Sequence, residues 1–86
     1  MSILSEINSI LFTRDPMRTG CVENKLEDEY IEEAVAINHL IDMDASDLEI
    51  EVVVKTVFDK FFWDNCLDEE TTSELSREIH HVLAKS

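Results

Sequence analysis

Residues 48–63, LEIEVVVKTVFDKFFW, form the most hydrophobic segment of the chain, and their conformation decides the fold class. The β-branched cluster at residues 50–54 suits a strand as well as a helix. Apolar residues nevertheless recur at helical spacing for about four turns, and no turn residue interrupts them. These positions include Leu48, Val53, Val57 and Phe61. Length and continuity therefore predict a helix, which we expect at the centre of the core.

Helix signals lie on both sides of this segment. Ser46 and Glu49 have the spacing of a capping box, which predicts a helix start at Ser46. After the segment, Asp68 or Thr71 is expected to begin a last helix. Its apolar stripe consists of Leu75, Ile79, Val82 and Leu83.

The N-terminal part predicts a helix, a break and a second helix. SILSEINSILF (2–12) has apolar residues at helical spacing, so we expect a helix that ends near Thr13. Pro16 and Gly20, the only proline and glycine of the chain, exclude a continuous helix through the stretch that follows.

The second helix is expected from about Lys25 or Asp28 to Ile41. Asn24 is followed three residues later by Glu27, a pattern typical of a helix N-terminus. The expected inward stripe is Tyr30, Ala34, Ile37 and Ile41. The sequence thus predicts an all-α fold, in which a single acidic domain over residues 1–86 packs four helices, with an irregular loop between the first two.

Charge and cysteine content restrict the function. Seven Lys and Arg against 20 Asp and Glu give a formal net charge of -13. Such a chain repels nucleic-acid phosphates and anionic lipids, so we expect neither nucleic acid nor a membrane as a partner. The two cysteines cannot form a disulfide-rich framework, and the N-terminus lacks a basic leader and a cleavage site. These features indicate a cytoplasmic protein.

Three residue patterns were compared with the requirements of catalytic and metal sites, and each lacks a required feature. DMDASD (42–47) alternates acids, but Asp47 and Val53 occupy the positions where a calcium-binding EF-hand needs glycine and glutamate. His80 and His81 are adjacent, and on a helix they point about 100° apart. Cys66 with one of these histidines is the remaining nucleophilic pairing, without an oxyanion signature around it. We expect no metal, no cofactor and no enzymatic activity.

The acids of LEDEYIEEA (26–34) have two readings. The first is a solvated helix face, with Arg14, Arg18 or Lys25 folding back as counter-charges. The second is an anionic surface for a basic partner. On the second reading, the candidate partner-binding residues are Glu27, Asp28, Glu29, Glu32 and Glu33, with Asp42, Asp44 and Asp47 nearby in sequence.

Aromatic residues suggest a second kind of interface. Phe58, Phe61, Phe62 and Trp63 cannot all face inward from one helix, because successive positions rotate by about 100°. Some of them are covered by neighbouring helices or by another chain. Phe62 and Trp63 are the candidates for self-association, which would give a homodimer.

The order of elements across nearly the whole chain resembles a family of small, uncharacterised bacterial proteins, a domain of unknown function. Its signature reads W-D-P-hydrophobic, a variable loop and D-E-Y-D, followed later by an aromatic cluster. The residues of this chain that carry the resemblance are Asp15, Pro16 and Met17, then Asp28, Glu29 and Tyr30, then Phe58, Phe61 and Phe62. Arg14 stands where tryptophan is usual, and Ile31 stands where the second aspartate is usual.

This resemblance implies an all-helical fold and, through related genes near bacterial toxin systems, a role as an immunity or inhibitor protein. It supplies no catalytic residues. The signature also makes structural sense: Asp15 can accept loop N–H groups, and Pro16 can fix the turn. Asp28 and Glu29 can cap the next helix, above Tyr30. We therefore expect a non-enzymatic domain that presents its acidic face to a basic protein, with self-association through the aromatic residues as the alternative.

Overall fold

Four α-helices make up most of the described chain, which in this computed structural model comprises residues 2–21 and 23–85. They are α1 (Ile3–Arg14), α2 (Ile31–Leu40), α3 (Asp47–Phe61) and α4 (Glu69–Lys85). No strand occurs among these residues, and residues 50–54 lie within α3. The all-α prediction is confirmed, including the helical conformation of the β-branched segment.

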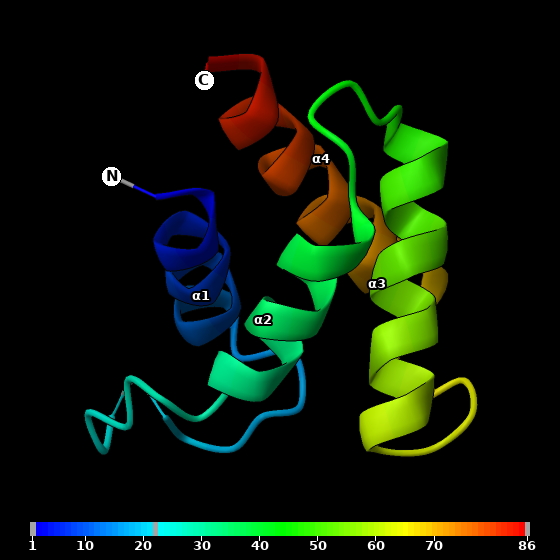
Figure 1. Ribbon diagram of the computed structural model, residues 1–86. Helices are drawn as coiled ribbons and strands as arrows, with labels where there is room; N and C mark the ends of the chain where they lie inside the picture. Colours follow the sequence, from blue (N-terminus) through cyan, green and yellow to red (C-terminus); the bar gives the residue numbers. More distant parts are fainter. Residues whose placement is uncertain (1, 22, 86) are drawn as a thin grey trace.

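The helices pack so that each contacts two others (Figure 1). α1 and α3 each pack against both α2 and α4, whereas α1 and α3 make no direct packing contact within the described residues. The expectation that residues 48–63 form a central helix is therefore wrong. Only one side of α3 faces inward, and Leu48, one of the positions in the predicted apolar repeat, is 73% exposed. Its buried side chains are Ile50, Val54, Val57 and Phe58.

All four helices contribute to one core. The predicted stripes of α2 and α4 are largely confirmed, although Ile41 and Val82 are only half-buried. The buried apolar residues are Ile7, Leu11, Cys21, Tyr30, Ala34, Ile37, Ala45, Ile50, Val54, Val57, Phe58, Leu75, Ile79 and Leu83.

Side-chain caps begin three of the helices. Ser2 Oγ accepts the N–H of Ser5 at the start of α1. Ser46 and Glu49 form the predicted capping box of α3, each side chain accepting the other's backbone N–H at 3.2 Å. At the start of α4, Asp68 Oδ1 accepts the N–H of Thr71 at 2.7 Å. The predicted starts of these last two helices are confirmed.

The predicted start of α2 is wrong. α2 begins at Ile31, and its N-cap Tyr30 makes no side-chain capping bond. Residues 23–30 form successive turns instead, in which Lys25 has a left-handed φ of 56°. A left-handed residue cannot continue a right-handed helix. The amide of Asn24 donates to Gly20 O at 2.9 Å and so closes a turn, rather than capping a helix.

Candidate functional site

Asp15 organises the loop between α1 and α2. It ends α1 in a left-handed conformation, with φ 44°, and its carboxylate turns back over the loop. Oδ1 accepts the N–H of Thr19 at 2.8 Å and the hydroxyl of Tyr30 at 2.7 Å, and Oδ2 accepts the N–H of Gly20 at 2.8 Å. The Tyr30 hydroxyl in turn accepts the N–H of Met17 at 2.9 Å. The expectation that Asp15 accepts loop N–H groups is confirmed.

These hydrogen bonds change the acidity of both groups. Burial would raise the pKa of Asp15, but hydrogen bonds from Tyr30, Thr19 and Gly20 outweigh it and lower the pKa to about 2. Burial and the hydrogen bond to the Asp15 carboxylate raise the pKa of Tyr30 above its ordinary value. The pair is therefore a charged carboxylate and a neutral phenol at every ordinary pH, which suits a structural contact and not proton transfer.

Asp28 and Glu29 do not have the capping role that their pattern predicted. Both are exposed and lie in the turns before α2. The N–H of Ile31 bonds to the backbone oxygen of Asp28 at 3.2 Å, and the N–H of Glu29 bonds to Leu26 O at 3.1 Å. The D-P…D-E-Y residues therefore divide into a structural pair, Asp15 and Tyr30, and two solvent-facing acids.

The first five candidate partner-binding residues do come together. Glu27, Asp28, Glu29, Glu32 and Glu33 all line one shallow hollow of about 630 Å³. Lys25, Leu26 and Ile31 complete its lining. We call this surface the acidic hollow. The side chain of Asn8 on α1 helps to fix its position, because its amide donates to Glu27 O at 3.2 Å.

The carboxylates of the acidic hollow are not paired with basic side chains, although Lys25 is part of its lining. None of its five carboxylates forms an ion pair within residues 2–21 and 23–85. Arg14 pairs instead with Glu78 of α4 at 2.5 Å, and lies 3.6 Å from Glu74. Arg18 lies near Asp68. Of the three counter-charges expected for a purely solvated face, Arg14 and Arg18 thus lie near other acids, whereas Lys25 lines the hollow itself without forming an ion pair there.

Glu33 is the buried member of the acidic hollow. Only 5% of its surface is exposed, whereas the other four acids are exposed. Burial, together with the charges of Glu32 and Glu29, raises the pKa of Glu33. Its carboxylate forms no ion pair and no hydrogen bond to the side chain of another described residue. Glu33 is therefore an acid of the hollow with little exposed surface and a raised pKa, to which the neighbouring charges of Glu32 and Glu29 contribute.

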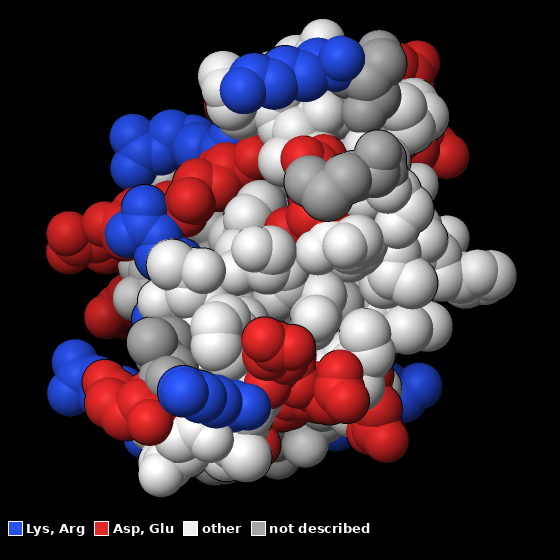
Figure 2. Space-filling model, turned by 90° about the vertical axis from the view of Figure 1, so that its left-hand side faces the viewer, with Lys and Arg blue, Asp and Glu red and all other residues white. Residues whose placement is uncertain are grey.

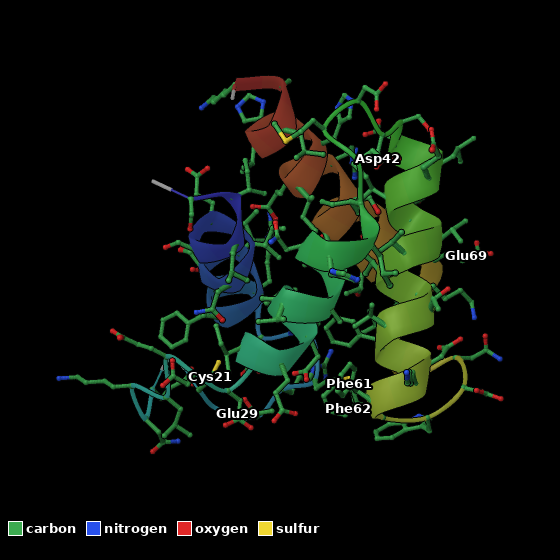
Figure 3. All side chains as sticks on the ribbon, viewed as in Figure 1. Cys21, Glu29, Asp42, Phe61, Phe62 and Glu69 are labelled. Atoms are coloured by element: carbon green, nitrogen blue, oxygen red, sulfur yellow. The ribbon has the colours of Figure 1, made fainter. Side chains whose placement is uncertain are left out.

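The other three candidate acids lie elsewhere. Asp42 follows the C-terminus of α2, and Figure 3 shows it at the opposite end of the molecule from Glu29. The ten residues of α2 separate the two groups by about 15 Å. Asp47 approaches His80 of α4, with 3.3 Å between Oδ1 and Nδ1. Asp42, Asp44 and Asp47 thus belong to a separate surface.

Charge on the side of the molecule formed by α1 and the following loop is uneven (Figure 2). Carboxylates gather at the lower end and at the upper left edge of that face, in both places beside basic side chains, and most of the area between them is uncharged. On this face the charge is therefore not evenly spread.

The two candidate self-association residues are in different environments. Phe62 is half-buried and stacks on Phe58, with ring centroids 5.5 Å apart. Trp63 is 60% exposed and meets Phe62 edge-on at 6.3 Å. Trp63 also lines a hollow of about 450 Å³ beside Arg14 and Arg18. Of the two, Trp63 offers the larger free aromatic surface.

The cysteines and histidines are not arranged as a catalytic site. Cys66 precedes α4, and more than three turns, or about 16 Å of helix, separate the start of α4 from His80. The Cys66 thiol donates to Phe58 O, and the buried Cys21 thiol donates to Phe12 O. Burial raises the pKa of Cys21, which suppresses its thiolate. Within the described chain, no group of three or more potential ligands could hold a metal ion.

An apolar surface between α2 and α3 was not predicted from the sequence. Ile31 and Val35 of α2 and Phe61 of α3 line an apolar groove of about 250 Å³, with Glu32 at its edge. The spacing of Ile31 and Val35 signals a shared face of α2, but their position next to Phe61 depends on how α2 and α3 pack. We call this feature the apolar groove.

Comparison of the chain with protein-family models, curated proteins and solved structures finds no match. None of the described helices is long and apolar enough to span a bilayer.

Proposed function

We propose that this chain is a non-enzymatic protein-binding domain that presents the acidic hollow to a basic surface of another protein, in the manner of an immunity or inhibitor protein. The observation that carries this proposal is the group of five carboxylates lining one hollow without an ion pair to any described basic side chain. Such a surface attracts a basic partner over long range and so speeds association.

The D-P…D-E-Y resemblance supports the same role. Its structural part, Asp15 and Tyr30, is joined by a hydrogen bond, and its acidic part, Asp28 and Glu29, faces solvent. Hydrogen bonds that hold a loop before it binds reduce the conformational entropy lost on binding. Both cysteines are free thiols, which suits the reducing cytoplasm where such a protein would act.

Affinity capture from the native host tests the proposal. The bait is wild-type protein, compared with a double variant, Glu29→Gln and Glu32→Gln, and with a matched control that carries Asp42→Asn and Asp44→Asn. We expect a basic protein to be captured by wild type and by the control, and to be lost from the acidic-hollow variant. The rate at which the captured protein associates with wild type should fall steeply as added salt shortens the Debye length from about 10 Å to about 3 Å. Equal capture by all three baits would contradict the proposal.

Self-association through Phe62 and Trp63 is the second candidate, because Trp63 exposes a large aromatic surface. Sedimentation equilibrium of wild type and Trp63→Ser distinguishes the two. A dimer that dissociates in the variant would favour this alternative, and a monomer in both would remove it.

A further inference from the structure

The apolar groove is an exposed hydrophobic surface formed by two helices. Val35 is 49% exposed and Phe61 is 42% exposed. Both lie with Ile31 between the first turns of α2 and the last turn of α3. The volume of about 250 Å³ is smaller than the roughly 300–1,000 Å³ of a typical small-molecule pocket. The groove is therefore a shallow apolar contact surface, of a size that one large side chain could cover.

The apolar groove and the acidic hollow are continuous. Ile31 and Glu32 line both of them. Figure 3 shows Glu29 and Phe61 at the same end of the molecule, at the N-terminus of α2 and the C-terminus of α3. Glu33, a residue with only a small exposed surface, also lines the hollow, one residue after the shared Glu32. A ligand seated in the groove would thus have unpaired carboxylates beside it.

We propose that the two features form one docking surface for a segment of a partner protein in which a large apolar side chain is flanked by lysine or arginine. This inference rests on the proposed function and specifies the chemistry of the partner. The apolar side chain enters the groove against Val35 and Phe61, and the flanking cations reach Glu32, Glu29 and Glu33. Protein interfaces commonly combine such a central apolar anchor with a charged rim.

Charge complementarity selects this occupant over others. A second copy of this chain carries the same net charge of -13 and would bring a second acidic hollow to the contact. An anionic lipid surface is also negatively charged, and the protein's net negative charge repels it. A basic segment gains attraction from the acidic hollow and apolar contact from the groove.

The test measures fluorescence anisotropy with three labelled synthetic peptides. The first has a central phenylalanine flanked by lysine and arginine, the second has serine in place of the phenylalanine, and the third has glutamine in place of the basic residues. Wild-type protein should bind the first peptide most tightly. Both the loss of phenylalanine and the loss of basic residues should weaken binding by about tenfold or more.

Variants of the protein locate the binding surface. Val35→Ser and Phe61→Ser should weaken binding of the phenylalanine peptide about tenfold and leave the serine peptide unchanged. Glu32→Gln should weaken both basic peptides and reduce the salt dependence of binding. Val52→Ser is the matched control, because Val52 is 65% exposed on α3 and does not line the groove. Circular dichroism melts confirm that each variant is folded.

Several results would overturn the inference. If wild type binds both basic peptides equally, the acidic hollow acts without the groove, and the proposed function stands while the inference fails. Equal weakening by Val52→Ser would show that the effect is not specific to the groove. A wild-type dimer that Phe61→Ser dissociates would show that a second copy occupies the groove. If neither basic peptide binds, the inference fails, and the capture experiment separately decides the proposed function.

Discussion

Tyr30 connects the two ends of the loop through a single hydroxyl. It donates to Asp15 and accepts from Met17, while its ring is fully buried against the core. Tyr30→Phe keeps the ring but leaves the Met17 N–H without this acceptor and Asp15 without this donor. We expect a loss of about 1–3 kcal/mol in the free energy of unfolding, measured by urea denaturation.

Asp28→Ala is the matched control for this variant. Asp28 belongs to the same sequence signature, but its exposed side chain makes no hydrogen bond to another described residue. Its replacement should change stability by no more than about 0.5 kcal/mol. Equal losses in the two variants would contradict the division of the signature into a structural pair and solvent-facing acids.

The Asp15 carboxylate also predicts a pH dependence. Its pKa is lowered from 3.8 to about 2 in the folded protein. The charged form is therefore favoured by folding, so its contribution is fully present above about pH 4 and is lost as the pH falls toward 2. Urea unfolding across this range should show a fall in stability that is smaller in Asp15→Asn. The same slope in both proteins would show that other carboxylates control acid unfolding.

At the scale of the element, the capping box of α3 combines the two reciprocal bonds of Ser46 and Glu49. Ser46→Ala removes the hydroxyl that accepts the Glu49 N–H, and we expect a loss of about 0.5–2 kcal/mol in the free energy of unfolding. Ser46→Asp retains a capping oxygen and should stay close to wild type. A loss of the same size in Ser46→Asp would mean that the serine matters for a reason other than capping.

The N-termini of the helices show which capping patterns in the sequence are sufficient to predict a helix start. Ser46 with Glu49, and Asp68, predict starts that the structure confirms, because each cap satisfies N–H groups within three residues of itself. Asn24 with Glu27 has a comparable pattern, but the helix start that it predicts is not formed. The chain there is held by Asp15 and Tyr30, whose contact spans 15 residues, and Lys25 adopts a left-handed conformation. A local pattern contains no information about that long-range contact.

At the scale of the whole molecule, sequence separation limits what could be predicted of the candidate site. The acidic hollow comes from residues 25–33, so proximity in the chain was enough to group its five acids. The same proximity predicts that Asp42, Asp44 and Asp47 belong to this surface, but α2 separates the two sets of acids. The apolar groove joins Val35 to Phe61, and only the packing of α2 against α3 brings them together.

The acidic hollow should also reduce the stability of the free protein. Its carboxylates repel one another without ion pairs, and Glu32 and Glu29 both help to raise the pKa of the buried Glu33. Glu32→Gln removes one of these charges and is expected to raise the free energy of unfolding at low salt by about 0.2–0.5 kcal/mol. Because salt already screens the repulsion of exposed charges, the gain should shrink as ionic strength rises.

Glu70→Gln is the matched control, because Glu70 and Glu32 are both exposed in the first turn of a helix, where a negative charge favours the helix dipole, but Glu70 does not line the acidic hollow. This variant should be neutral or slightly destabilised. Thermal and urea unfolding at low and high salt would measure both variants. If Glu32→Gln is destabilised at low salt, the carboxylate contributes to folding, and the acidic hollow would be a stabilising surface. If Glu32→Gln is more stable than wild type but binds the basic peptides more weakly, then the Glu32 charge opposes folding and favours binding. Such a trade-off is expected where a surface is adapted to a partner of opposite charge.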